Sequence, residues 1–176
     1  NGIEIYPIGD LGPFTGELNG NGYTIRNAVI NEPNSDYVGL FGYIGTGGQI
    51  HDLGVENIQI IGRDYVGGLA GRNYSGTIDG CYVTGSVTGT DDYVGGLAGR
   101  NYSSGKISNC GTDISVNGDS YVGGLVGYNY NSGMITNCCA RGSVSARYYG
   151  GGLVGENTTG SITFCYATGL VTGKNC

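Results

Sequence analysis

Residues 65–81 read YVGGLAGRNYSGTIDGC, and residues 93–110 repeat this text as YVGGLAGRNYSSGKISNC, with one extra serine. The opening phrase occurs five times in the chain, as YVGLFG, as YVGGLAG twice, as YVGGLVG and as YGGGLVG. Tyr65 follows Tyr37 by 28 residues (65 − 37 = 28), and the same interval separates each later tyrosine of the phrase from the one before it. A fixed period of this length indicates a solenoid, whose repeats bury their apolar sides only against their neighbours.

The period divides the chain of 176 residues into one domain of successive coils. Five repeats span residues 37–64, 65–92, 93–120, 121–148 and 149–176. A sixth, degenerate repeat spans residues 9–36, and residues 1–8 look like the last third of a further coil. We therefore expect a single solenoid of six to seven coils, with about 28 residues in each.

The composition excludes several classes of protein. Glycine supplies 38 residues, tryptophan is absent and only 12% of residues are charged, so no window shows the apolar stripe of a helix. The formal net charge of −6 would repel a phosphate backbone, so nucleic acid is not an expected partner. We expect neither a membrane span nor a signal peptide, because no apolar run is long enough. The chain begins at Asn1 and its sole methionine is Met134, so we expect a processed chain or an excised piece.

Two intervals within the repeat are constant. The cysteines at 81, 110, 138 and 165 each lie three residues after an isoleucine, as Cys81 does after Ile78, and six residues before a valine, as Cys81 does before Val87. The other intervals vary by one residue, so the insertions belong to loops, because a slip within a strand would turn every side chain to the other face. The pattern predicts three short strands per coil, stacked in register about 4.8 Å apart as an all-β parallel β-helix.

Side-chain parity assigns the interior. Every second residue from each cysteine is small or apolar, while the residues between them are mostly polar. The interior residues are Cys81, Val83, Gly85, Val87, Cys110, Thr112, Ile114, Val116, Cys138, Ala140, Gly142, Val144, Cys165, Ala167, Gly169 and Val171. Ile78 has the opposite parity, so we expect a corner or a bulge between it and Cys81. We expect the glycines of the opening phrase to form corners with positive φ.

Four tetrads with the pattern Gly-Leu-Ala/Val-Gly resemble the motif of the GLUG repeat family. They begin at Gly68, Gly96, Gly124 and Gly152. The flanking glycine, isoleucine, cysteine and valine are similar too, and residues 13–27, PFTGELNGNGYTIRN, resemble the coil that often precedes such repeats. The first repeat lacks one glycine of the phrase, and Gly150 replaces the usual valine in the last repeat.

The resemblance implies a right-handed parallel β-helix in bacterial secreted or cell-surface proteins, including adhesins and the non-catalytic regions of immunoglobulin A1 metallopeptidases. It implies no chemistry for the repeat itself. His51 is the only histidine, so the HExxH signature of a zinc peptidase is absent from this sequence, and no peptidase activity is expected.

Four cysteines occupy the same position of successive repeats and are expected to form a column: Cys81, Cys110, Cys138 and Cys165. Stacking would bring their α-carbons within reach of a disulfide, but parallel side chains point alike and make the bridge geometry awkward. A metal site needs convergent ligands rather than a linear file. We therefore favour buried free thiols over disulfides and over metal binding. Cys139 has outward parity, and a bond between it and Cys176 is not expected.

Two files of tyrosines and one of asparagines follow the period. The tyrosines are Tyr37, Tyr65, Tyr93, Tyr121 and Tyr149, and Tyr74, Tyr102 and Tyr130. We favour stacked ladders for both files, with a sugar-binding aromatic strip as the alternative. The asparagines Asn73, Asn101, Asn129 and Asn157 predict an amide ladder at a turn.

Acidic residues lie before several of these tyrosines, at Asp36, Asp64, Asp91, Asp92 and Asp119. A calcium ion could bridge carboxylates one coil apart, but we favour solvated loop carboxylates because the calcium-binding nonapeptide pattern is missing. The acidic positions follow the repeat and build no irregular pocket, so we expect no enzyme. We predict no catalytic, cofactor-binding or metal-binding residue and no cofactor.

The expected function is that of a non-catalytic structural or interaction module of a secreted or cell-surface protein, an adhesin-like rod or stalk. Its partner would be a host or cell-surface protein or a glycan. The alternative is an extracellular filament built by head-to-tail stacking of copies, because exposed coil ends are templates for pairing. A carbohydrate-binding or polysaccharide-acting β-helix is a minor alternative.

Overall fold

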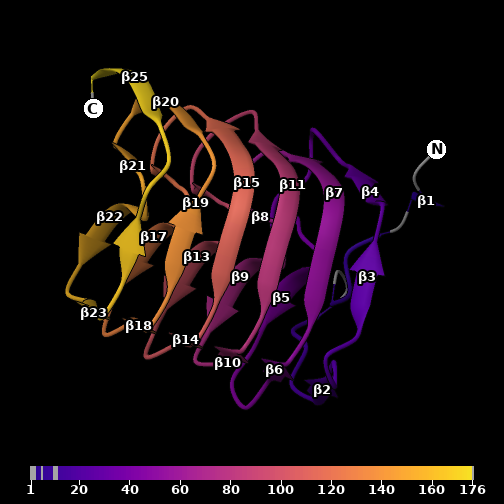
Figure 1. Ribbon diagram of the computed structural model, residues 1–176. Coiled ribbons are helices and arrows are strands. Elements are labelled where there is room, and N and C mark those ends of the chain that lie inside the picture. Colours follow the sequence, from indigo (N-terminus) through magenta and orange to yellow (C-terminus); the bar gives the residue numbers. More distant parts are fainter. Residues whose placement is uncertain (1–2, 5, 10–11, 176) are drawn as a thin grey trace.

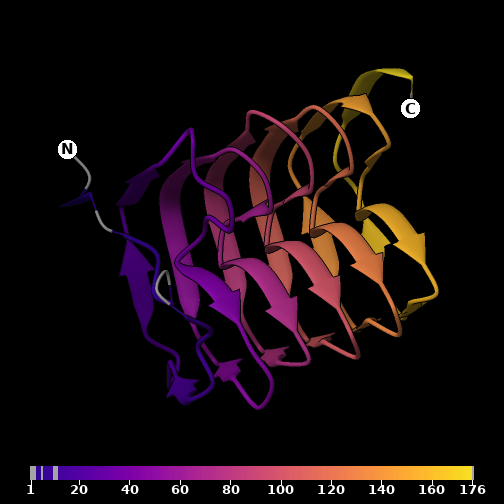
Figure 2. The same cartoon turned by 180° about the vertical axis from the view of Figure 1, so that it is seen from behind.

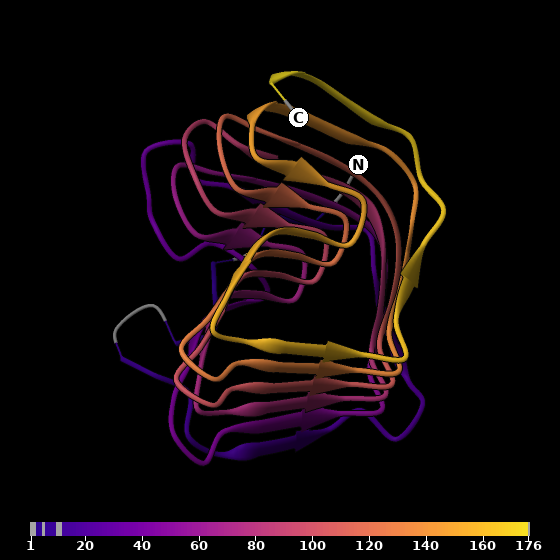
Figure 3. The same cartoon turned by 90° about the vertical axis from the view of Figure 1, so that its left-hand side faces the viewer.

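The computed structural model describes residues 3–4, 6–9 and 12–175, and all regular elements in these residues are β-strands. The chain winds into coils that stack along one axis (Figure 1). Viewed along this axis with the C-terminal coil nearest, each coil runs counter-clockwise as the chain approaches the viewer (Figure 3). The solenoid is therefore right-handed, and the predicted parallel β-helix is confirmed.

The coils of residues 65–92 and 93–120 contain four strands each, not the three expected from the sequence. In the coil of residues 65–92 they are β8 (Val66–Gly67), β9 (Ala70–Tyr74), β10 (Thr77–Asp79) and β11 (Tyr82–Gly89). The additional strand is the Val-Gly pair, which a corner at Gly68 and Leu69 separates from β9. The expectation was wrong because a strand of two residues is too short to show an alternating pattern.

Equivalent strands pair into four parallel sheets, which we name by residues that recur in them. The VG sheet contains β8, β12 (Val94–Gly95), β16 (Val122–Gly123) and β21 (Gly150–Gly151). The tyrosine sheet contains β5 (Phe41–Ile44), β9, β13 (Ala98–Tyr102), β17 (Val126–Tyr130) and β22 (Val154–Thr158).

The other two sheets continue the coil after the turn that follows the tyrosine sheet. The isoleucine sheet contains β2 (Glu17–Asn19), β6 (Gln49–His51), β10, β14 (Lys106–Ser108), β18 (Met134–Thr136) and β23 (Ser161–Thr163). The valine sheet contains β1 (Ile3–Glu4), β3 (Thr24–Arg26), β4 (Ala28–Asn31), β7 (Gly54–Gly62), β11, β15 (Gly111–Gly118), β19 (Cys139–Arg141), β20 (Val144–Tyr148), β24 (Tyr166–Ala167) and β25 (Val171–Asn175).

The extra serine of residues 93–110 is accommodated in a turn, and the register of the strands is unchanged. Ile78 pairs with Ile107 although 29 residues separate them (107 − 78 = 29). The added residue lies in the turn between β13 and β14, where Ser103 and Ser104 adopt φ values of 55° and 65°. The turn absorbs the insertion, so the strands on either side keep their register, as predicted.

The degenerate coil predicted at residues 9–36 stacks on the coil of residues 37–64. Strand β2 pairs with β6, and β3 and β4 pair with β7 (Figure 2). Strand β1, from the partial coil predicted at residues 1–8, pairs with β4. Residues 1–2, 5, 10–11 and 176 lie outside the described residues, and the prediction about Cys176 falls there.

The core is the space enclosed by the sheets, and columns of like residues fill it. In one coil Val66, Leu69, Ile78 and Val83 are completely buried. Full burial of such a side chain stabilises the fold by about 1.5–3 kcal/mol. The side chains that parity assigned to the interior are buried from Cys81 through Val144, as predicted. Those of the last coil are more exposed, and Ala167 is open to solvent.

The corner predicted between Ile78 and Cys81 is present, but the glycines of the opening phrase act differently from the prediction. Gly80 forms this corner with φ at 61°. The phrase glycines have no positive φ and instead permit close backbone contact, since a Cβ on Gly95 would lie 2.0 Å from the carbonyl oxygen of Ala98. The prediction therefore gave the wrong physical reason for the glycines of the opening phrase.

Candidate interaction surface

The five tyrosines that open the repeats stack as one file, which we call the corner ladder. Its members are Tyr37, Tyr65, Tyr93, Tyr121 and Tyr149. The centroids of successive rings lie 4.8 to 4.9 Å apart and the ring planes differ by 13° or less. All five residues adopt positive φ, from 49° to 58°, which is unusual for a bulky side chain. The predicted stacking is confirmed.

Outward-facing residues of the tyrosine sheet form two further files beside the corner ladder. One file is Tyr43, Arg72, Arg100, Tyr128 and Glu156. The other is Tyr74, Tyr102 and Tyr130, whose successive ring centroids lie 5.4 and 5.6 Å apart. Tyr128 joins these files to the corner ladder, because its ring lies 5.6 Å from those of Tyr93 and Tyr121. We call the three files together the tyrosine–arginine face.

The backbone brings these files together by turning back on itself. Between the VG strand and the tyrosine strand of each coil the chain reverses direction, so the corner ladder and the outer face of the tyrosine sheet lie on the same side (Figure 3). The reversal needs the close backbone contacts that only glycine permits, as at Gly67, where a Cβ would lie 2.1 Å from the carbonyl oxygen of Ala70. The glycine phrase thus positions the aromatic surface.

Two guanidinium groups lie among the rings of this face. Arg72 Cζ lies 5.0 Å from the ring centroid of Tyr43 and 5.2 Å from that of Tyr102. Arg100 Cζ lies 4.4 Å from the centroid of Tyr102 and 5.4 Å from that of Tyr128. Each contact falls within the range in which an aromatic face attracts a cation. The face therefore combines flat rings with fixed positive charge.

The predicted amide ladder lies behind this face, on the inner side of the tyrosine sheet. Asn73, Asn101 and Asn129 are completely buried. The Nδ2 of Asn73 donates to Oδ1 of Asn101 at 2.9 Å, and Asn101 donates to Asn129 at 2.9 Å. Each amide also donates to a turn carbonyl of its own coil, as Asn101 does to Gly105 at 3.0 Å. The ladder fixes both the turn and the spacing of coils.

The acidic residues lie near the corner ladder. Arg63 donates to both carboxylate oxygens of Asp36 at 2.8 Å. Burial raises the pKa of Asp64 to about 7, and the charges of Asp36, Asp92 and Asp91 add to the shift. In the described part of the chain, no three His, Cys, Asp or Glu side chains gather as metal ligands. For the other acidic residues near the corner ladder, we still predict carboxylates that are solvated and bind no metal.

The raised pKa of Asp64 predicts a pH dependence of stability. The folded chain holds the Asp64 proton more tightly than the unfolded chain, where an aspartate has a pKa of about 3.9. The contribution of Asp64 to the free energy of unfolding therefore falls as pH rises from about 4 to about 7 and is constant above that. We expect Asp64→Asn to weaken this decline, as measured by urea denaturation from pH 5 to pH 8.

A change at a solvated carboxylate provides the control for Asp64→Asn. Asp113 lies exposed on β15, so Asp113→Asn is expected to leave the pH profile as it is in the unaltered chain. Equal profiles for the Asp64→Asn variant and the unaltered chain would show that Asp64 is not protonated in the folded state.

The cysteine column is assembled as predicted. Cys81, Cys110 and Cys138 carry buried free thiols and Cys165 a partly buried one. The backbone N–H of Cys110 donates to Sγ of Cys138 at 3.4 Å, so the side chains of successive coils lie one above another. The pKa of the Cys110 thiol is raised, first by its hydrogen bonds to Cys138 and Cys81 and then by burial. The Cys110 thiol is therefore held protonated and acts as a small apolar side chain.

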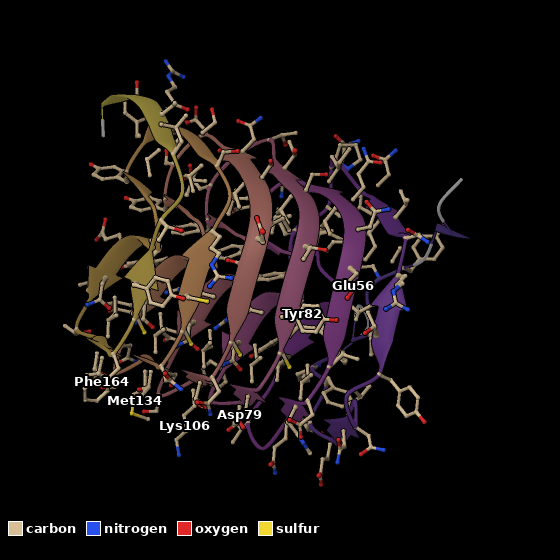
Figure 4. The ribbon with its side chains drawn as sticks, viewed as in Figure 1. Glu56, Asp79, Tyr82, Lys106, Met134 and Phe164 are labelled. Carbon is tan, nitrogen blue, oxygen red and sulfur yellow. The ribbon has the colours of Figure 1, made fainter. Side chains whose placement is uncertain are left out.

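The valine sheet carries a polar network on its outer side. Tyr82 and Glu56 project from it next to each other (Figure 4). Hydrogen bonds from Tyr82 and Arg26 lower the pKa of Glu56, and the Arg26 Nε lies 2.7 Å from the Glu56 carboxylate. A carboxylate held ionised in this way is a poor proton donor at neutral pH. The network therefore favours a structural role for Glu56.

The geometry defines a class of protein: a right-handed parallel β-solenoid with an aromatic and cationic outer face. The family model described as the GLUG motif matches residues 62–88, 118–145 and 146–172. These matches fall on three of the coils, and the resemblance found in the sequence is confirmed.

Two curated proteins are similar to parts of the chain. Halomucin of Haloquadratum walsbyi is 41% identical over 89 residues, which are 51% of this chain and 1% of that protein. A candidate Gly-rich membrane protein of Evansella cellulosilytica is 44% identical over 77 residues, which are 42% of this chain and 9% of that protein. The chain thus spans only a small part of each relative.

A solved structure shares the fold. It is the crystal structure of a candidate immunoglobulin A1 protease from Bacteroides ovatus, with a TM-score of 0.60 and 19% sequence identity. The similarity covers 99% of this chain and 68% of that one. Residues 3–4, 6–9 and 12–175 contain no helix long and apolar enough to cross a membrane.

Sequence reasoning found the tyrosine files but missed the arginines among them. Arg72 and Arg100 occupy the same position of two successive repeats, where the neighbouring coils carry Tyr43, Tyr128 and Glu156. Because this position changes from coil to coil, the period does not highlight it. The signal that could have found it is parity, since this position lies two residues before Tyr74 and Tyr102 and so faces the same side.

Proposed function

We propose that the chain is a non-catalytic interaction module of a secreted or cell-surface protein, an adhesin-like rod that presents its tyrosine–arginine face to a surface ligand. The observation that carries the proposal is this face, which extends over several coils while the core columns beneath it stay uninterrupted. A rigid, repeated surface suits the binding of an extended ligand better than the conversion of a small one. The names of the relatives, a halomucin and a membrane protein, support a place at the cell surface.

One hollow of the outer surface lacks the groups that catalysis would need. A hollow of about 630 Å³ lies on the valine sheet. Its lining is Asn27, Val29, Asn57, Ile58, Gln59, Gly85 and Ser86. These residues include no acid, base or activated nucleophile, which an active site would need. The likeness to a candidate protease concerns the fold alone.

An array experiment tests the proposal. The purified chain is applied to immobilised surface glycans and cell-surface proteins, and bound ligands are then examined by mass spectrometry. We expect retention on one class of ligand, with the mass of that ligand unchanged. Retention no greater than that of serum albumin on every array position, or cleavage of a bound ligand, would overturn the proposal.

Self-assembly into a filament is the second candidate. Within the described residues, Leu153, Val154 and Ile162 of the last coil are only partly buried although they pack on the core. A second copy stacked on this coil would cover them and pair with its open strand edges. Negative-stain electron microscopy distinguishes the candidates: fibres that lengthen with concentration indicate self-stacking, and dispersed short rods at high concentration exclude it.

A further inference from the structure

Two arginines of the tyrosine–arginine face lack the partners that the other arginines have. Arg26 and Arg63 form ion pairs with carboxylates at 2.7 and 2.8 Å, and Arg141 donates to the hydroxyl of Tyr166 at 3.0 Å. Among the described residues, Arg72 and Arg100 have neither an ion pair nor a hydrogen bond, and the Nε of each is buried without a partner. Native structures leave few buried donors unpaired, so these two call for an explanation.

The ring contacts satisfy only part of each guanidinium. A ring attracts the cation through the flat face of the guanidinium, whereas the five N–H donors point outward in its plane. Only Nε of Arg72 and of Arg100 is enclosed without a partner. The terminal nitrogens therefore remain accessible to solvent and can donate to a ligand. The rings also hold each guanidinium in place, so little side-chain freedom remains to be lost on binding.

The two arginines also occupy equivalent positions on adjacent strands. Arg72 and Arg100 are register partners on β9 and β13, so two like charges lie opposite each other one coil apart. Such a pair destabilises a sheet unless an anion lies between or above the charges. Elsewhere the chain is acidic, with a net charge of −6, so this pair is a local cationic site on a negative protein.

We propose that the tyrosine–arginine face binds an acidic oligosaccharide, with its carboxylates on Arg72 and Arg100 and its hydroxyls on the hydroxyls of neighbouring tyrosines. A carboxylate matches the bidentate geometry of a guanidinium. The flat faces of the tyrosine rings are occupied by neighbouring rings and by the guanidinium groups, so a sugar would meet the ring edges and the tyrosine hydroxyls, which can accept and donate hydrogen bonds. This inference rests on the proposed function and names the ligand class of the same face.

Other anionic ligands fit the face less well. A peptide commonly adds to a sheet through an open strand edge, but β9 and β13 are paired on both sides. Nucleic acid would meet the net negative charge of the chain along its whole backbone. Glu156 lies two coils from Arg100 in the same file. Because its carboxylate would repel an anion, anion binding is limited to the coils that contain the arginines.

Calorimetric titration of the full chain tests the inference. The probes are a short oligogalacturonate and its methyl ester, which keeps the sugar rings and lacks the charge, with polyglutamate and single-stranded DNA as anions without sugar carboxylates. We expect oligogalacturonate to bind at least about tenfold more tightly than each of the other probes. Added salt is expected to weaken this binding. Equal binding of the methyl ester, polyglutamate or DNA would overturn the proposal, as would no binding of oligogalacturonate at low salt.

Variants locate the site. The double substitution Arg72→Gln and Arg100→Gln is expected to weaken oligogalacturonate binding at least about tenfold. Arg63→Gln, which breaks the pair with Asp36 at the corner, is expected to leave it unchanged. Thermal melting shows whether each variant is folded, and the double change to lysine, which keeps the charge, serves if the glutamine form melts early. For that form we expect a smaller loss, because lysine cannot bind a carboxylate bidentately.

The experimental outcomes distinguish a failure of this inference from a failure of the proposed function. If the chain binds an array ligand but the arginine substitutions leave that binding unchanged, the interaction module stands and the acidic saccharide is wrong. If the chain binds no array ligand and no acidic sugar, both are wrong.

Discussion

Replacing Gly95 with alanine is expected to lower the free energy of unfolding by at least about 3 kcal/mol. The added Cβ would lie 2.0 Å from the carbonyl oxygen of Ala98 and 2.7 Å from the amide nitrogen of Gly127 in the next coil. Both are backbone atoms, so relief requires the chain reversal to open and the stacked coil to shift. Urea denaturation followed by circular dichroism measures the loss.

The control for Gly95→Ala is the same change where there is space. A Cβ on Gly12 would meet no atom within 4 Å, so Gly12→Ala is expected to change the free energy of unfolding by less than about 0.5 kcal/mol. If Gly95→Ala is tolerated as well as Gly12→Ala, the close reversal between the VG sheet and the tyrosine sheet does not exist as described.

The second large effect is expected at the centre of the amide ladder. Asn101→Leu keeps a similar volume but removes the hydrogen bonds to Asn73, Asn129 and Gly105, and leaves buried polar groups without partners. Each unsatisfied group costs about 1–3 kcal/mol, so we expect a total loss of about 3 kcal/mol or more. Urea denaturation again measures it.

The end of the same ladder provides the comparison. Asn157 is exposed and accepts a hydrogen bond from Asn129 at 2.6 Å. Water can replace the lost partner there, so Asn157→Leu is expected to cost about 1 kcal/mol. Equal losses at Asn101 and Asn157 would mean that buried amide pairing does not hold the coils together.

The sequence predicted the features that obey the repeat. A constant period places equivalent residues one above another, so the cysteine column at Cys110 and Cys138 and the amide ladder at Asn73 and Asn101 follow directly from spacing. Loop insertions were also predictable, because the core fixes the register and leaves turns as the place for the extra serine.

The features that depend on backbone detail could not be predicted in this way. Positive φ falls on tyrosines such as Tyr93 rather than on the glycines beside them, since the glycines are needed where two backbones meet. The arginine site depends on Arg72 and Arg100, which the period does not single out. Each of these arginines has a buried Nε without a partner, and this depends on the positions of the surrounding side chains, which the sequence alone does not give.

The central claim is that the backbone of each coil is hydrogen-bonded to the equivalent backbone one coil away. The amide of Leu97 donates to the carbonyl of Leu125 at 2.8 Å, and Leu69 donates to Leu97 at 2.9 Å. Scalar couplings across hydrogen bonds, measured by NMR on the isotope-labelled chain, test this directly. We predict couplings from the nitrogen of Leu69 to the carbonyl carbon of Leu97 and from Leu97 to Leu125. Couplings from these nitrogens to carbonyls only a few residues away, as in hairpins, would contradict the account.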